Sequence, residues 1–122
     1  MYKPDGWPVV IPRIVVDEPE PLVGFVKHVF GATGNFNPDR PSELRIGESM
    51  IMISGSSDRD QMPAFLYVYV EDTDLTYRRA LDSGATSIEE PRDLPYGDRR
   101  AMVRDGWGNV WQIATHSGRF TP

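Results

Sequence analysis

Hydrophobic residues recur along the chain with two spacings, which separate its expected strands from its expected helices. An alternation of period two, rich in Val, Ile and Tyr, predicts strands, because successive side chains of a strand point to opposite faces. These strands are expected over residues 9–16, 43–46, 49–53, 64–70, 86–90, 99–104 and 109–115, with a further short strand near Asn35. Gly, Pro and Asn between the runs mark the turns.

Two other segments have the spacing of an amphipathic helix. The first has its apolar stripe at Leu22, Phe25, Val26, Val29 and Phe30, which predicts a helix over 20–30 that Asp17 caps and Gly31 ends. The second is expected to begin at Asp72 or Thr73, with a stripe of Tyr77, Ala80, Leu81 and Gly84. Each helix is followed by the same three letters, Gly-Ala-Thr, at 31–33 and at 84–86.

The order of elements therefore occurs twice: a strand, an acidic cap, a helix, and then short strands that end in a hairpin. This order predicts an α+β fold of two tandem βαβββ modules and argues against a doubly wound parallel sheet. We place module one at about 9–54, a polar linker at about 55–63 and module two at about 64–116. Together they are expected to form one domain over 1–122.

Composition excludes several classes of function. The formal net charge is -5 without a compensating basic cluster, so no nucleic-acid partner is expected. The chain has no cysteine, which excludes disulfides and thiolate chemistry. No apolar run approaches the roughly 20 residues of a membrane span, and the first residues lack the apolar region of a signal peptide. We therefore expect a cytoplasmic protein with no membrane partner.

Three motifs carry a family resemblance: Phe30-Gly31-Ala32 at a helix end, the stretch 43–49 (ELRIGES), and the stretch from Pro95-Tyr96-Gly97-Asp98-Arg99 through 111–116 (WQIATH). With the βαβββ repeat, they make the chain similar to the vicinal oxygen chelate superfamily, which includes glyoxalase I, bleomycin-resistance proteins and extradiol dioxygenases. The resemblance covers nearly the whole chain, and it is strongest to the PhnB-like branch, whose members mostly have no defined function.

The resemblance implies where a metal would bind. In metal-dependent members, four His, Glu or Gln side chains come from the first and last strands of each module. Those positions are Ile11, Met52, Phe65 and Gln112 here, and three of the four are apolar. Divalent ions need oxygen or imidazole ligands, so we expect no metal and no cofactor. The two histidines, His28 and His116, stand at other positions and are interpreted as structural or solvated.

The resemblance also implies a cleft on the sheet face that the helices leave uncovered. Strand phase assigns to the helix side an apolar set of Ile14, Val16, Ile51, Ile53, Leu66, Val68, Val70, Trp111 and Ile113. The predicted ligand-binding cleft residues are Arg13, Met50, Met52, Phe65, Tyr67, Tyr69, Trp107 and Gln112. Aromatic faces and thioethers suit a flat apolar ligand. Arg13 would pair with an anionic group of the ligand, or internally with Glu43, Glu71 or Asp98.

Three functions remain open. The first is a metal-free protein that binds an apolar or aromatic small molecule, antibiotics included, as a homodimer. The second is a divergent metal-dependent lyase, isomerase or dioxygenase, for which Glu43, Gln112 and His116 are the candidate ligands. The third is an interaction module whose cleft is filled. No residue is assigned a catalytic role, because Asp98 and Arg99 are interpreted as pairing or capping locally in their turn.

Overall fold

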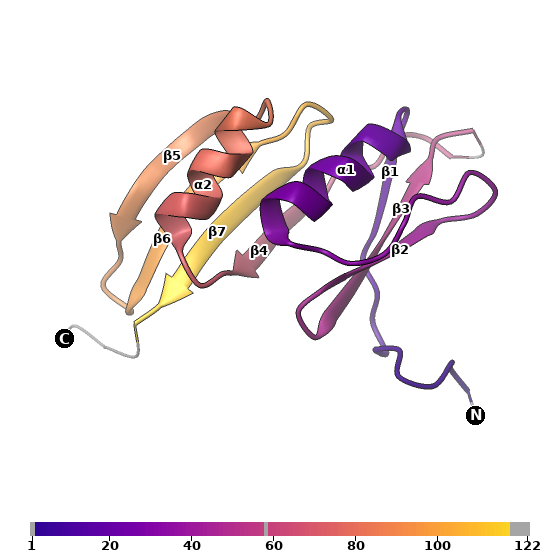
Figure 1. The fold of residues 1–122 in the computed structure, drawn as a ribbon, viewed down its shortest axis with the longest axis horizontal. Coiled ribbons are helices and arrows are strands. Elements are labelled where there is room, and N and C mark those ends of the chain that lie inside the picture. Colours follow the sequence, from indigo (N-terminus) through magenta and orange to yellow (C-terminus); the bar gives the residue numbers. More distant parts are fainter. Residues whose placement is uncertain (1, 58, 118–122) are drawn as a thin grey trace. The chain divides into compact units, whose positions relative to one another are not determined.

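The computed structural model of the chain describes residues 2–57 and 59–117 (Figure 1). It divides into two compact units, Met1–Met62 and Pro63–Pro122. Each unit has one helix packed against one sheet. Neither described helix is long and apolar enough to cross a membrane.

Unit 1 contains β1 (Arg13–Val16), α1 (Pro19–Phe30), β2 (Ser42–Ile46) and β3 (Ser49–Gly55). Its strand order is β1-β3-β2, with β1 parallel and β2 antiparallel to β3. Helix α1 packs on β2 and β3 through a buried stripe of Leu22, Val23, Phe25, Val26 and Val29. The expected short strand near Asn35 is reduced to one bridge, in which Thr33 and Arg45 exchange two backbone hydrogen bonds of 2.9 Å.

Unit 2 contains β4 (Phe65–Tyr69), α2 (Thr73–Asp82), β5 (Thr86–Asp93), β6 (Asp98–Arg104) and β7 (Val110–His116). Its strand order is β4-β7-β6-β5, with β4 parallel to β7 and the other pairs antiparallel. If the Thr33 bridge is counted as the missing strand, both units have the same order. The α+β class expected from the sequence is thereby confirmed.

Two element ends differ from the expected ones for local reasons. Strand β1 begins at Arg13 and not at residue 9, and Val9 and Val10 are exposed. Pro12 lacks the N–H that a ladder requires, so β-branched residues before it do not extend the strand. At the start of α1 the N-cap is Glu18 without a side-chain cap, because Asp17 accepts a hydrogen bond from the Ser56 hydroxyl instead.

The stripe predicted for α2 is right at Ala80 and wrong at its other positions, where Tyr77 and Leu81 are only half-buried. The buried residues of this helix are Thr73, Thr76 and Ala80, whereas Gly84 lies beyond its end and is exposed. The Thr73 hydroxyl donates to the Arg99 carbonyl on β6 at 2.9 Å, so a polar residue occupies the helix–sheet contact with its hydrogen bond satisfied. Asp72 caps the helix as expected, accepting from the Leu75 N–H at 3.1 Å.

Candidate functional site on the open face of unit 2

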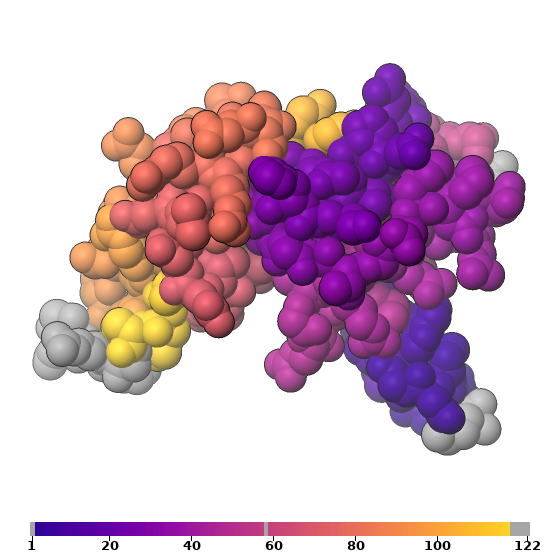
Figure 2. Space-filling view, in the orientation of Figure 1, coloured from indigo at the N-terminus to yellow at the C-terminus, as the bar shows by residue number. Residues whose placement is uncertain are grey.

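Helix α2 covers one face of the unit 2 sheet. In Figure 1 it lies in front of β6 and β7, and Figure 2 shows the same side in space-filling form. Its Thr73 hydroxyl lies 2.8 Å from that of Thr115 on β7, and its Tyr77 hydroxyl donates to Ser87 on β5 at 2.7 Å. Because neighbouring residues of a strand face opposite ways, Gln112, Ala114 and His116 belong to the other face, which we call the open face.

Strand register extends the open face across all four strands. Residues directly opposite each other in a sheet share a face, and the pairs run from β4 through β7 and β6 to β5. The open face comprises Phe65, Tyr67 and Tyr69 on β4, Val110, Gln112, Ala114 and His116 on β7, Asp98, Arg100, Met102 and Arg104 on β6, and Thr86, Glu89 and Arg92 on β5. Aromatic, charged and amide side chains thus share one surface.

A column of three aromatic side chains lines the β4 edge of this face. Phe65, Tyr67 and Tyr69 are 66%, 38% and 61% exposed. The rings of Tyr67 and Tyr69 lie 5.3 Å apart between centroids and are tilted by 58°. Successive same-face positions on one strand bring these rings together, as period-two alternation predicts. Large aromatic faces that remain exposed are a surface on which a flat molecule can stack.

Asp98 ties this column to the rest of the face. Its side chain is almost fully buried, and it accepts hydrogen bonds from the Tyr67 hydroxyl at 2.5 Å and the Tyr69 hydroxyl at 2.9 Å, both at Oδ2. Its Oδ1 lies 2.8 Å from Nδ1 of His116, the residue opposite it on β7. We call these four residues the Asp98 cluster. It joins three strands at one end of the sheet.

A second set of polar contacts continues from the Asp98 cluster towards β5. The Tyr96 hydroxyl lies 3.5 Å from that of Tyr67 and accepts from Arg100 at 3.3 Å. The same guanidinium donates to Glu89 Oε1 at 3.1 Å, and its Nε is buried with no hydrogen-bond partner among the described residues. A continuous polar chain therefore runs from His116 across the sheet to Glu89.

The cluster shifts the titration of its members. Burial alone would raise the pKa of Asp98, but the hydrogen bonds from Tyr67, His116 and Tyr69 outweigh it and hold this pKa below its usual range. Burial and the bond to Asp98 raise the pKa of Tyr67 strongly, and the bond to Asp98 raises the pKa of Tyr69. At neutral pH, Asp98 is therefore a carboxylate and both phenols carry their protons.

The hairpin between β6 and β7 is fixed by a buried carboxylate of its own. Asp105 accepts from the backbone N–H groups of Trp107 and Asn109, and its Oδ2 accepts from the side chains of Asn109 and Trp111 at 2.9 and 2.8 Å. Asn109 in turn accepts from the Ala64 N–H at 2.8 Å, just before β4. This network sets the register of β6, β7 and β4, and so the geometry of the open face.

The residues predicted for the cleft fall in both units. In unit 2, Phe65, Tyr67, Tyr69 and Gln112 lie on the open face, whereas Trp107 is in the turn at the opposite end of the hairpin from His116. In unit 1, Arg13 pairs with Met52 across β1 and β3, and Met50 is 3% exposed. Arg13 Nε donates to the Ser54 hydroxyl at 3.0 Å, which replaces the carboxylate partner expected for it.

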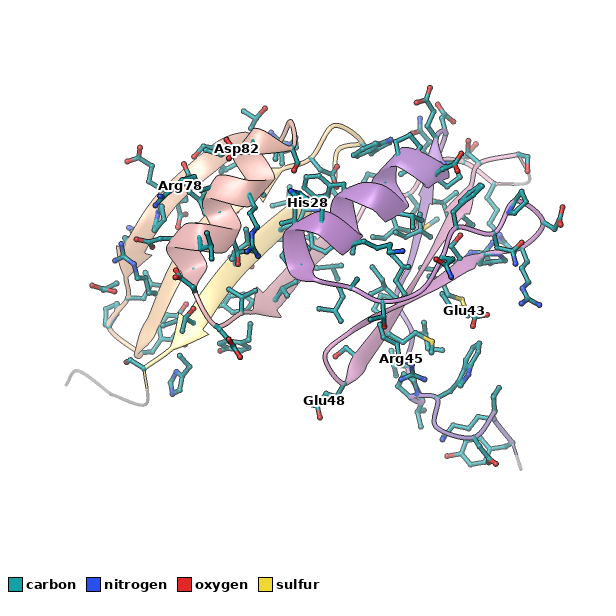
Figure 3. All side chains as sticks on the ribbon, in the orientation of Figure 1. His28, Glu43, Arg45, Glu48, Arg78 and Asp82 are labelled. Carbon is teal, nitrogen blue, oxygen red and sulfur yellow. The ribbon has the colours of Figure 1, made fainter. Side chains whose placement is uncertain are left out.

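Unit 1 has a separate polar hollow of about 250 Å³ beside the loop before β2. Asn35, Phe36, Asn37, Arg40, Pro41 and Glu43 line it. Figure 3 labels Glu43 and Arg45 on β2. Arg45 donates to the Gly6 carbonyl at 3.1 Å. The hollow contains neither an aromatic column nor a buried titratable group, so it offers less for recognition than the open face of unit 2.

The donor set does not suit the metal centre that the resemblance implies. Residues 2–57 and 59–117 contain no group of three or more His, Cys, Asp or Glu side chains placed to hold an ion. Gln112 and His116 stand four residues apart on β7, which separates them by about 13 Å along a strand. His28 is exposed in the last turn of α1 (Figure 3). Ile11, Met52 and Phe65 offer a divalent ion no oxygen or nitrogen ligand.

Sequence reasoning assigned no ligand-binding role to Asp98, Tyr96 or Arg100, and it named His116 only as a candidate metal ligand. The expectation that Asp98 and Arg99 pair or cap locally is wrong for Asp98, which binds β4 and β7. It holds in part for Arg99, which pairs with Asp93 across the turn at 3.3 Å but also bonds Asp74 on α2 through two nitrogens at 2.8 and 3.2 Å. The sequence contained part of the information needed to find these residues. The alternation that put Gln112 on the open face also puts His116 there, and pairing β6 against β7 adds Asp98 and Arg100.

Comparison with known proteins identifies the family. The model of the Glyoxalase/Bleomycin resistance protein/Dioxygenase superfamily matches residues 9–113, and the chain belongs to this superfamily. The uncharacterized protein Rv0887c of Mycobacterium tuberculosis is 27% identical to it over 126 residues, covering 87% of this chain and 73% of the relative. The uncharacterized protein Mb0911c of Mycobacterium bovis has the same identity and is covered to 82%.

Solved structures show the same fold. TioX from Micromonospora sp. ML1 is similar with a TM-score of 0.69 and 22% identity, over 88% of this chain and 98% of that chain. A glyoxalase/bleomycin resistance protein/dioxygenase family enzyme from Burkholderia phytofirmans PsJN gives a TM-score of 0.73 and 21% identity, over 85% and 94%. Membership of the PhnB-like branch stays a prediction.

Proposed function

We propose that this chain is a small-molecule binding protein of its superfamily and that an aromatic or largely apolar ligand stacks on the open face of unit 2. The observation that carries the proposal is the exposed column of Phe65, Tyr67 and Tyr69, in which Asp98 holds the two tyrosines through their hydroxyls. Binding without a metal is part of the proposal, as is pairing into a homodimer. Antibiotics are one class of flat ligand to test, by analogy with the bleomycin-resistance members of the superfamily.

The physical advantage of this surface is that its rings are already ordered. Fixing a mobile side chain on binding costs about 0.5–1.5 kcal/mol. Tyr67 and Tyr69 lose little of that freedom because their hydroxyls are bonded to a buried carboxylate. Each aromatic pair formed with a ligand adds about 0.5–1.5 kcal/mol beyond the area buried. The face is therefore better suited to stacking than three unanchored aromatic residues would be.

A panel of aromatic compounds, antibiotics among them, tests the proposal through thermal unfolding followed by calorimetry of the hits. A ligand at a hundredfold excess over its Kd should raise the unfolding free energy by about 2.7 kcal/mol. Phe65→Ala should weaken binding of the hits, because Phe65 has an exposed ring on the open face. Leu75→Ala is the matched control, since Leu75 is an exposed apolar residue of α2 on the other side of the sheet.

Two outcomes would count against binding on this face. A chemically varied panel that leaves the unfolding temperature unchanged would favour the interaction module instead. Hits that Phe65→Ala and Leu75→Ala weaken equally would place the ligand elsewhere. The homodimer is checked separately by light scattering, where a mass near 13.8 kDa would show a monomer.

A further inference from the structure

We propose that the Asp98 cluster selects aromatic ligands that carry a protonated amine. This inference rests on the proposed function, since it names the chemical class of the ligand that the open face takes. It follows from the directions of the hydrogen bonds in the cluster and from the charges around it.

The tyrosine hydroxyls of the cluster present acceptors outwards. An ionised carboxylate can only accept hydrogen bonds, so the protons of Tyr67 and Tyr69 point at Asp98 Oδ2 over 2.5 and 2.9 Å. Each phenol has a single proton, so each oxygen offers a ligand only lone pairs; the Tyr67 oxygen shares its lone pairs with the Tyr96 hydroxyl, which then donates to it over 3.5 Å. The depressed pKa of Asp98 and the raised pKa of both phenols keep this arrangement across the neutral range.

In its neutral form, His116 adds a third acceptor beside them. Its Nδ1 lies 2.8 Å from Asp98 Oδ1, which assigns the proton of the neutral ring to Nδ1. Nε2 then carries a lone pair, and it has no hydrogen-bond partner among the described residues. The imidazole side chain is 46% exposed, so a ligand can reach it. Two phenol oxygens and one imidazole nitrogen thus form an acceptor surface at one end of the aromatic column.

The charge of Asp98 is left without a cationic partner when His116 is neutral. The nearest guanidinium groups have other carboxylates: Arg99 binds Asp74 and Asp93, and Arg100 binds Glu89. Arg92, opposite Arg100 on β5, also contacts Glu89. An ammonium group on the acceptor surface would lie beside the Asp98 carboxylate and the faces of two tyrosine rings, which attract cations. A ligand carboxylate in that place would face three acceptors.

The test compares tryptamine with indole-3-propionate, which share one ring system and differ in the sign of their charge. Calorimetry on the intact chain should give a Kd for tryptamine at least tenfold below that for indole-3-propionate at neutral pH. Tyr69→Phe and Asp98→Asn should each reduce this preference to about threefold or less. Tyr69→Phe keeps the exposed ring and removes the acceptor, so it tests the inference even where Asp98→Asn disturbs folding.

The control variant is Asp93→Asn, which removes a carboxylate at the other end of the β5–β6 connection without touching the cluster. It should leave the preference for tryptamine unchanged. Equal or tighter binding of indole-3-propionate would overturn the inference while leaving an aromatic binding face standing. A preference for tryptamine that survives both Tyr69→Phe and Asp98→Asn would also overturn it. If neither indole nor any other aromatic compound binds, the proposed function itself fails.

Discussion

Replacing Asp98 by Asn tests whether the cluster is held together as the structure shows. The carboxylate accepts three hydrogen bonds, from Tyr67, Tyr69 and His116, and its side chain is 1% exposed. A hydrogen bond to a charged group contributes about 1.5–3 kcal/mol. Tyr69 is 61% exposed and the His116 side chain 46%, so both can bond water instead, and Asn keeps one acceptor oxygen. We therefore expect the free energy of unfolding to fall by about 2–3 kcal/mol.

Urea unfolding followed by near-ultraviolet circular dichroism measures this loss, with Asp93→Asn as the matched control. The Asp93 side chain is 83% exposed, and its one ion pair among the described residues is with Arg99 at 3.3 Å. Exposed ion pairs contribute about 0–1 kcal/mol. A loss for Asp98→Asn within about 0.5 kcal/mol of the control would refute the reasoning, because it would mean that the cluster adds no stability.

The same pair of variants gives a pH signature. The pKa of Asp98 is lower in the folded chain than its ordinary value of about 3.9. The unfolded chain therefore takes up the proton first as the pH falls. The stability that Asp98 provides is complete above that ordinary value and is lost as the pH drops through the folded pKa. The gap between the wild type and Asp98→Asn should shrink as the pH falls below about 4. A gap that stays unchanged to pH 3 would contradict this.

Three further predictions concern the rest of the molecule. Asp105→Ala should cost about 3 kcal/mol or more, measured by urea unfolding, because it removes the acceptor of four hydrogen bonds in the β6–β7 hairpin, three of them buried; a loss under 1 kcal/mol would contradict this. Gly34→Ala should destabilise unit 1 by about 2–3 kcal/mol, because the φ of Gly34 is +117° and a Cβ there would lie 2.3 Å from a β2 carbonyl oxygen. Gly24→Ala, on the exposed side of α1, should instead stabilise the chain by up to about 1 kcal/mol. Similar shifts in unfolding temperature for the two variants would refute the contrast. In a titration followed by absorbance at 295 nm, Tyr67 and Tyr69 should be the last tyrosines to ionise, and Tyr67→Phe and Tyr69→Phe should each remove one of these late steps. Wild-type stability should fall as the pH rises above about 10, because the phenols ionise first in the unfolded chain.

Local pattern predicted the elements of the fold where one signal dominated. The run at 64–70 became β4 at Phe65–Tyr69, and the 3.6-residue stripe became α1. The prediction failed where the intrinsic preference of the residues differs from what pairing with neighbouring elements allows. The β-branched residues at 9–11 read as strand, yet Pro12 interrupts the ladder and β1 begins at Arg13. In α2, core positions are taken by Thr76 and by Thr73, whose hydroxyl bonds the sheet, and an apolar stripe cannot reveal them.

For the candidate site, the sequence predicted only which strand residues share one face of the sheet. Alternation placed Tyr67, Tyr69 and Gln112 on one face, and the structure agrees. The partners of Asp98 could not be read locally, because they lie 18 to 31 residues away and are brought together by the register of β4, β7 and β6. Nor does the sequence show that Arg13 meets Ser54, since that contact depends on how β1 pairs with β3.

The most direct test of the central claim is to map where a ligand binds. Backbone amide chemical shifts would be followed by nuclear magnetic resonance while tryptamine is added to the uniformly labelled chain. We predict shifts that saturate and that are concentrated at 65–69, 96–100 and 110–116, the segments that form the aromatic column and the Asp98 cluster. Shifts confined to unit 1, or none at ligand concentrations in the millimolar range, would contradict a binding face on unit 2.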